Sequence, residues 1–231
     1  MSGLRRFAVS ALCGAAFLLG SVAHAADAVP LFKEYRHGDS MAEFAQQEEA
    51  YEDCSELFNL PGALCRKTPE TFFTFDDWLL LLAGNGDRLQ TVTLVREGTE
   101  NDLAVAAASL LKSGYMVVAI DNGQSLVFDL FETVNVQKNR DIAGAVTKAE
   151  QALLGEPPVH IGYTFFNLND EDRRLSRSKS TADFLTNARP DLRAVELRWI
   201  QEDGSSLLTL IFRAVKQSQI DLLNSGVREE F

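Results

Sequence analysis

Apolar and polar positions between residues 89 and 167 repeat with the periods of strands and helices. Residues 89–96 alternate apolar residues with β-branched threonines, a pattern typical of a strand. Apolar residues then recur at helical spacing, which predicts a helix with one apolar face. Thr99 and Asp102 form a capping-box pair at its start, and Gly114 suits the position just beyond its end.

The second half of this stretch repeats the strand and helix patterns. Residues 115–120 form a continuous apolar run that is short enough for a buried strand. Asn122-Gly123 favours a type I′ turn, so residues 126–134 are expected to return as an antiparallel strand. A helical apolar stripe follows over 142–153, and residues 159–165 alternate as a further strand.

These elements predict an α+β fold, in which an antiparallel sheet carries helices packed on one face. The order over residues 89–167 fits a ferredoxin-like βαββαβ core. A set of tandem ββα units is the alternative, because three turns each join two predicted strands ahead of a predicted helix. These turns lie at residues 84–86, 122–123 and 203–204, and the last of them joins the strands expected over 192–200 and 207–215.

The 231 residues divide into three parts. Residues 1–25 combine Arg5-Arg6, an apolar run and an Ala23-His24-Ala25 motif, which is typical of a Sec-type signal peptide. Residues 26–70 are predicted to be a helical segment that holds two cysteines, and residues 71–231 to be the α+β domain. Cleavage would leave no stable membrane anchor, so we expect a periplasmic or secreted protein.

Cys54 and Cys65 are the cysteines that remain beyond residue 25. In an oxidising compartment such a pair predicts a disulfide, which would stabilise the fold by roughly 2–4 kcal/mol. A metal or redox role is less favoured, because the spacing fits neither a C-x-x-C motif nor a zinc site.

The formal net charge of −11 bears on the choice of partner. Nucleic acid and anionic lipid surfaces attract basic proteins, so neither is expected to bind this chain. A basic protein partner suits the charge, although an acidic surface that only keeps a protein soluble is the commoner reason for such a composition.

No convincing catalytic or cofactor-binding motif accompanies these elements. G-x-S-x-G and H-E-x-x-H are absent, and His37 and His160 are the histidines beyond the signal segment. Ser176 and Lys179 match S-x-x-K without a K-T-G partner, and a calcium-loop pattern starting at Asn167 fails at its glycine and final glutamate positions. We therefore expect no enzymatic activity, no cofactor and no metal site.

A long polar loop is predicted between Asn167 and Pro190, and loops of this length are commonly functional or mobile. We take it as the candidate partner-contact region. Its charged members are Asp170, Glu171, Asp172, Arg173, Arg174, Arg177 and Lys179.

Aromatic residues concentrate on the predicted strands. They would suit an apolar ligand pocket, but an ordinary core is the commoner use of such residues. The set comprises Phe72, Phe73, Phe75, Trp78, Phe128, Phe131, Tyr163, Phe165, Phe166, Trp199 and Phe212.

Together these features predict an exported, soluble, non-enzymatic binding protein of the bacterial cell envelope. It would act through its acidic surface on a protein partner, as an immunity or inhibitor protein or as an accessory protein. A carrier of small apolar ligands is the alternative, and a hydrolase with an unrecognised site is less favoured.

Overall fold

The computed structural model describes most of the chain between Ala28 and Lys216. The predicted signal peptide at residues 1–25 lies outside the described residues. None of the described helices is both long and apolar enough to cross a membrane. The described ranges are 28–47, 50–68, 71–155, 158–170, 172 and 177–216.

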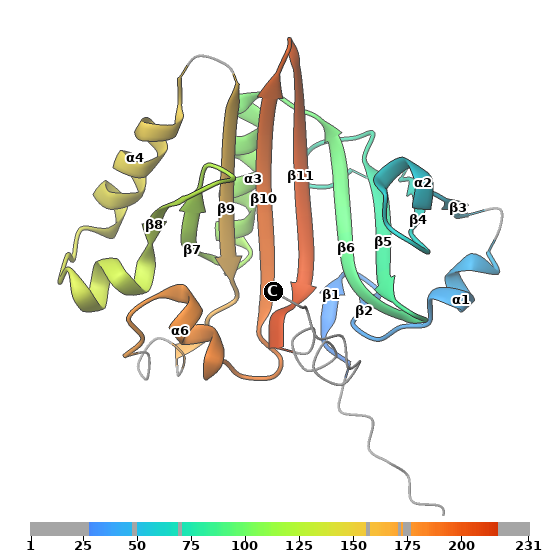
Figure 1. Ribbon diagram of the computed structural model, residues 1–231, viewed down its shortest axis with the longest axis horizontal. Coiled ribbons are helices and arrows are strands. Elements are labelled where there is room, and N and C mark those ends of the chain that lie inside the picture. Colours follow the sequence, from blue (N-terminus) through green and yellow to red (C-terminus); the bar gives the residue numbers. More distant parts are fainter. Residues whose placement is uncertain are drawn as a thin grey trace, which may run out of the picture.

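Nine strands of the described chain form one sheet, in which every neighbouring pair is antiparallel. Their order is β3-β4-β5-β6-β11-β10-β9-β7-β8 (Figure 1). The strands are Glu52–Asp53 (β3), Leu64–Lys67 (β4), Leu79–Asn85 (β5), Arg88–Glu97 (β6), Met116–Asp121 (β7), Leu126–Asp129 (β8), Val159–Phe166 (β9), Arg193–Glu202 (β10) and Ser205–Ala214 (β11). A separate pair, Pro30–Phe32 (β1) and Tyr35–Arg36 (β2), lies beside this sheet, where β1 contacts β6 and β11.

Two long helices pack on the sheet, α3 against β7 and β10, and α4 against β7, β8 and β9. Figure 1 shows α3 behind β9 and β10, and α4 beside the β7–β8 edge. The helices are Met41–Ala45 (α1), Ser55–Phe58 (α2), Glu100–Lys112 (α3), Ile142–Leu153 (α4) and Thr181–Thr186 (α6), with a π-helical turn, η1, at Glu132–Val136.

Alternating apolar residues build the buried face of the sheet. Phe165, Val195, Phe212 and Val92 are successive cross-strand partners on β9, β10, β11 and β6, and all four are buried. Burial of each such side chain contributes about 1.5–3 kcal/mol, so this face supplies most of the cohesion of the sheet. The next row repeats the pattern with Tyr163, Leu197, Leu210 and Leu94.

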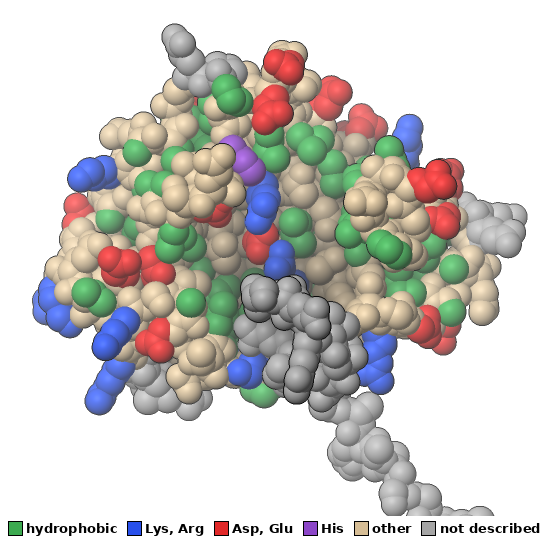
Figure 2. All heavy atoms as spheres, in the orientation of Figure 1, with side chains coloured by type: hydrophobic (Ala, Val, Ile, Leu, Met, Phe, Trp, Pro, Cys, Tyr) green, Lys and Arg blue, Asp and Glu red, His purple; other side chains and the backbone are tan. Residues whose placement is uncertain are grey.

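The opposite face of the sheet is more polar. On one side of it, Phe58 of α2 packs in a small apolar cluster with Leu81 of β5. On β10 and β11, Arg198 and Arg213 both donate to the carboxylate of Glu196, at 2.9 and 2.8 Å. Figure 2 shows charged and histidine side chains in a narrow stripe down this face. Antiparallel sheets commonly keep one such solvated face.

The structure agrees with the predicted α+β class and antiparallel sheet, but the ferredoxin-like core is not confirmed. In that core the strands at 89–96 and 159–165 would be neighbours, whereas β10 and β11 stand between β6 and β9. The reason lies in the last hairpin. It presents apolar residues on one face and pairs with strands on both sides, which puts it at the centre of the sheet.

The local order is that of hairpins followed by helices, as in the ββα alternative. β5 and β6 pair as a hairpin before α3, and β7 and β8 pair as a hairpin before α4. β10 and β11 form a third hairpin, and the residues beyond 216 lie outside the described part of the chain.

Two predicted elements are interrupted. The segment predicted to be helical over residues 26–70 holds, in its described part, only the short helices α1 and α2, with β3 between them and β4 after them. The strand expected over 126–134 ends at Asp129, because the carboxylate of Asp129 accepts from the backbone N–H groups of Phe131 and Glu132, at 2.9 and 3.2 Å. That carboxylate starts η1 at the point where the strand pattern continues in the sequence.

The predicted disulfide joins Cys54, just before α2, to Cys65 in β4, with the Cα atoms 5.9 Å apart. It fits an oxidising compartment such as the periplasm or the cell exterior. Both β3 and β4 belong to the nine-stranded sheet, so the segment 26–70 contributes strands to the same sheet as the remainder of the chain.

Replacing Cys54 and Cys65 together by serine is expected to lower the free energy of unfolding by about 2–4 kcal/mol, because the open loop gains freedom in the unfolded chain. Urea unfolding followed by circular dichroism measures this change. A reductant should destabilise the wild-type protein equally and leave the double variant unaffected. Equal stability of the oxidised wild type and the double variant would contradict the expectation.

Candidate functional site

A groove between the two long helices is lined mostly by apolar side chains and has a volume of about 320 Å³. Ile161 and Tyr163 of β9 form its floor, and α3 and α4 form its walls. We call it the α3–α4 groove. Its lining comprises Glu100, Leu103, Ala104, Ala107, Ala108, Leu111, Glu150, Leu154, Ile161 and Tyr163.

Helix α3 forms one wall of the groove because its apolar face is wider than the stripe that it buries against the sheet. The capping box of Thr99 and Asp102 is present, with bonds of 2.9 and 3.3 Å, and it starts the helix so that Glu100 lies in the first turn. Leu103, Ala106 and Leu110 are then buried. Small alanines at positions 104, 107 and 108 lie beside this buried stripe and leave room for the groove.

The α4 wall is set by a second cap, in which the Asp141 side chain accepts from the N–H of Gly144 at 2.9 Å. The buried side of α4 includes Ala149, and the next residue, Glu150, faces the groove. Leu154 follows one turn later at the end of the helix. Its side chain is 41% exposed, and Leu111 on the other wall is 51% exposed, so both rims of the groove are apolar.

Two carboxylates and a phenol give this apolar groove its polar groups. The hydroxyl of Tyr163 donates to Glu150 Oε1 at 2.9 Å. Burial raises the pKa of Tyr163, and the negative charges of Glu150 and then Glu100 raise it further. Within the described residues neither carboxylate has an ion-pair partner. The groove therefore combines apolar walls with two carboxylates that no described cation pairs with, which suits an apolar group that carries a cation.

The reactive groups of the groove are two carboxylates and a phenol. No serine, cysteine or histidine lines it, and its two glutamates lie on separate helices with a phenol as their common neighbour. Among the described residues, no three or more histidine, cysteine or acidic side chains gather in a metal-binding arrangement.

The predicted partner-contact loop is only partly described. Asp172 is an internal contact, because its carboxylate accepts from Arg189 Nε at 2.9 Å with only 10% of its side chain exposed. Arg177 and Lys179 are exposed cations and would suit an acidic group better than a basic one. Asp170 is described and exposed, and the remaining predicted members, Glu171, Arg173 and Arg174, lie outside the described residues, as does Ser176.

The predicted aromatic set divides between the core and the groove. Trp78, Phe165 and Phe166 are buried in the core, and Tyr163 is the member that reaches the groove. His160 is half-buried, and its ring lies so close to Gly123 that no Cβ would fit there. This contact gives His160 a structural role in the turn between β7 and β8.

The sequence interpretation missed the groove because its walls come from segments that are far apart in the chain. The available signal was the surplus of apolar residues on the helix predicted between Thr99 and Gly114, where Ala104, Ala107 and Leu111 exceed what one buried stripe requires. A glutamate at position 150, inside an apolar helical stripe, was a second signal.

The chain matches no protein-family model, no curated protein and no solved structure. A function is therefore inferred from the geometry of the groove.

The alkaline titration of the tyrosines tests this geometry. The pKa values of Tyr35, Tyr115 and Tyr163 are all raised above 10.0, chiefly by burial. Their stabilising effect is therefore complete below pH 10 and is lost as the pH rises further, so the free energy of unfolding should fall above pH 10. Phenolate absorbance at pH 10 should be lower for the folded protein than for the protein in urea.

Tyr163→Phe should remove one phenol from the late-titrating group and leave the phenolate signal of the folded protein at pH 10 unchanged. Tyr115→Phe is the matched control, because the pKa of Tyr115 is raised by burial and no carboxylate contributes to that rise. A clear fall of the folded signal at pH 10 in Tyr163→Phe would show that burial and Glu150 do not raise the pKa of Tyr163.

Proposed function

We propose that this protein is a non-enzymatic binding protein of the cell envelope that takes a basic, apolar segment of a partner protein into the α3–α4 groove. The observation that carries the proposal is an apolar groove with two carboxylates, Glu100 and Glu150, that have no cationic partner within the described residues. The disulfide supports the compartment, since such bonds persist where the surroundings are oxidising.

Electrostatics favours a cationic partner at two scales. The formal net charge of −11 attracts basic proteins over a distance of about one Debye length, roughly 8–10 Å at moderate salt. At the groove, Glu150 is half-buried and bonded to Tyr163, so a lysine or arginine beside it would be less screened than at an open surface, whereas Glu100 is exposed at the start of α3. The long-range attraction accelerates encounter, and the groove selects the segment.

The apolar rims supply the remaining affinity. Leu111 and Leu154 are large apolar residues exposed at the mouth of the groove, and a partner side chain seated between them would bury them. Binding energy concentrates at such buried anchors rather than over the whole contact area. A segment with one cationic residue beside one or two large apolar residues fits this arrangement.

The test compares two double variants with the same change of net charge. Glu100→Gln/Glu150→Gln removes the groove charges, and Glu43→Gln/Glu56→Gln removes two exposed charges from α1 and α2, outside the groove. The probe is a synthetic leucine–lysine helical peptide, with a leucine–glutamate peptide as its counterpart. We expect the groove variant to bind the lysine peptide about 5–30-fold more weakly, since each of the two charge contacts contributes about 0.5–1 kcal/mol.

The control variant should keep most of the wild-type affinity, and the leucine–glutamate peptide should not bind. Pull-downs from an envelope extract with the same three proteins would then identify the natural partner as a protein retained by the wild type and the control only. Equal weakening in both double variants would contradict a groove site, because it would mean that only the overall charge matters.

A carrier of small cationic amphiphiles is a second candidate, because the groove volume of about 320 Å³ also suits a small molecule. Trp199 is buried under the start of α3, where its Nε1 donates to the carbonyl of Gly98 at 2.9 Å. Dodecylammonium in the groove should shift the fluorescence of Trp199 and leave that of Trp78 unchanged. Stronger binding of dodecylammonium than of the lysine peptide would favour the carrier.

A further inference from the structure

A second cleft lies on the other side of α4, between that helix, η1 and β8, with a volume of about 590 Å³. It shares no lining residue with the α3–α4 groove. All four residues of β8 line it, together with polar side chains of η1 and the turn after it, including Thr133, Gln137 and Asn139. We call it the β8–α4 cleft.

β8 is the terminal strand of the sheet, so one of its edges has no strand partner in the described part of the chain. Edge strands of this kind are usually kept from pairing with other chains by being short, by a bulge or by charged side chains. β8 is short and has a bulge opposite Ile120 and Asp121, but it carries apolar side chains at the edge. Leu126 is 55% exposed and Val127 is 39% exposed.

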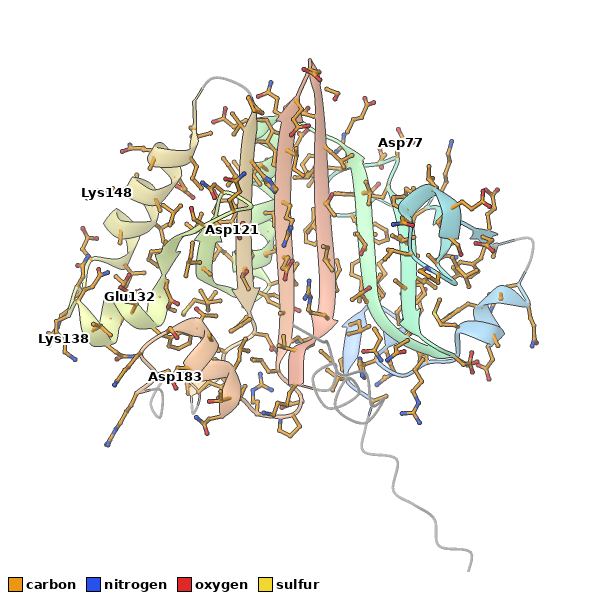
Figure 3. All side chains as sticks on the ribbon, in the orientation of Figure 1. Asp77, Asp121, Glu132, Lys138, Lys148 and Asp183 are labelled. Carbon is orange, nitrogen blue, oxygen red and sulfur yellow. A yellow bond between two sulfur atoms is a disulfide. The ribbon has the colours of Figure 1, made fainter. Side chains whose placement is uncertain are left out.

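The cleft has the polarity of a site for a peptide main chain. Its amide and hydroxyl side chains offer both donors and acceptors, as does an open strand edge. Its exposed charges are the carboxylates of Glu132 and Asp141 against the ammonium of Lys148, which leaves one excess negative charge, whereas Asp129 is buried and bound by backbone N–H groups. Figure 3 labels Glu132 and Lys148, which come from η1 and α4.

We propose that β8 accepts an extended, cationic segment of a partner protein as an added antiparallel strand between β8 and α4. Four residues of β8 span about 13 Å, which allows pairing with a segment of similar length. Main-chain hydrogen bonds would hold the segment, Leu126 and Val127 would contact its apolar side chains, and the acidic lining would select lysine or arginine.

The shape of the cleft favours a single segment over a second copy of this chain. Another copy would bring a whole sheet edge with its own η1 and α4, whereas α4 already forms the far wall facing β8. A lone strand needs only the space between β8 and α4. This site goes beyond the groove and shares with the proposed function only the expectation of a cationic partner.

The experiment uses a blocked valine–lysine peptide as the probe, and the same peptide with every second backbone nitrogen methylated. Methylation removes main-chain donors and keeps the side chains and the charge. We expect the parent peptide to bind and the methylated peptide to bind at least about tenfold more weakly. Hydrogen exchange of the backbone amides at residues 126–129 should slow when the parent peptide is present.

Two tryptophan substitutions on exposed positions of α4 provide the matched pair. Ala152→Trp fills the cleft, whereas Ala143→Trp places the same side chain outside its lining. Ala152→Trp should weaken binding of the parent peptide at least about tenfold, and Ala143→Trp should leave it unchanged. Glu100→Gln/Glu150→Gln should preserve the effect of backbone methylation, so this proposal and the groove proposal can fail separately.

Three results would overturn strand addition. Equal affinity for the parent and methylated peptides would show that main-chain bonds are not used. Absence of binding by the parent peptide would exclude a cationic extended segment. A concentration-dependent dimer of the free wild-type chain that Ala152→Trp dissociates would show that a second copy occupies the edge.

Discussion

The pairing of β10 with β9 on one side and with β11 on the other is the interaction on which the rest of the structure depends. It joins the two halves of the sheet, because β5 and β6 reach β9 and β7 only through this hairpin. Residues such as Leu197 and Leu210 at its centre are fully buried, so the pairing and the apolar core are formed together. This hairpin therefore joins parts of a sheet whose described strands run from Glu52 to Ala214, and such long-range pairing is slow to form.

The groove is a consequence of that sheet. β9 is held in register by β10, and this register brings Tyr163 and Ile161 to the face that carries α3 and α4. Both helices use their most apolar stripes to cover the sheet, and the alanines of α3 are too small to close the gap between the helices. Glu150 remains at the groove because its partner is the hydroxyl of Tyr163 on the strand below. Helix α4 thus has a sheet-covering side and two further sides that face separate concavities.

Some acidic side chains of this protein bind backbone N–H groups or an arginine, and others have no cationic partner within the described residues. The sequence alone does not show which acidic residue has which role. Asp129, Asp141 and Asp102 cap backbone N–H groups at the starts of η1, α4 and α3, and Asp172 pairs internally with Arg189. Glu100 and Glu150 have no such cationic partner within the described residues, although they belong to the same class of residue. The net charge of −11 does not distinguish these roles, and the proposal of a cationic partner rests on the position of Glu100 and Glu150 at the groove.

The sequence by itself determined the local features: the Cys54–Cys65 pair, the capping box at Thr99, the hairpins and the apolar faces of α3 and α4. Each depends on residues close together in the chain, whose backbone preferences and side-chain spacing act without distant partners. Only the tertiary structure decided the strand order, the end of β8 at Asp129, and the meeting of Glu100, Glu150 and Tyr163. The physical reason is that alternating apolar strands are equivalent as local patterns, and competition among them for neighbours is settled by burial over the whole sheet.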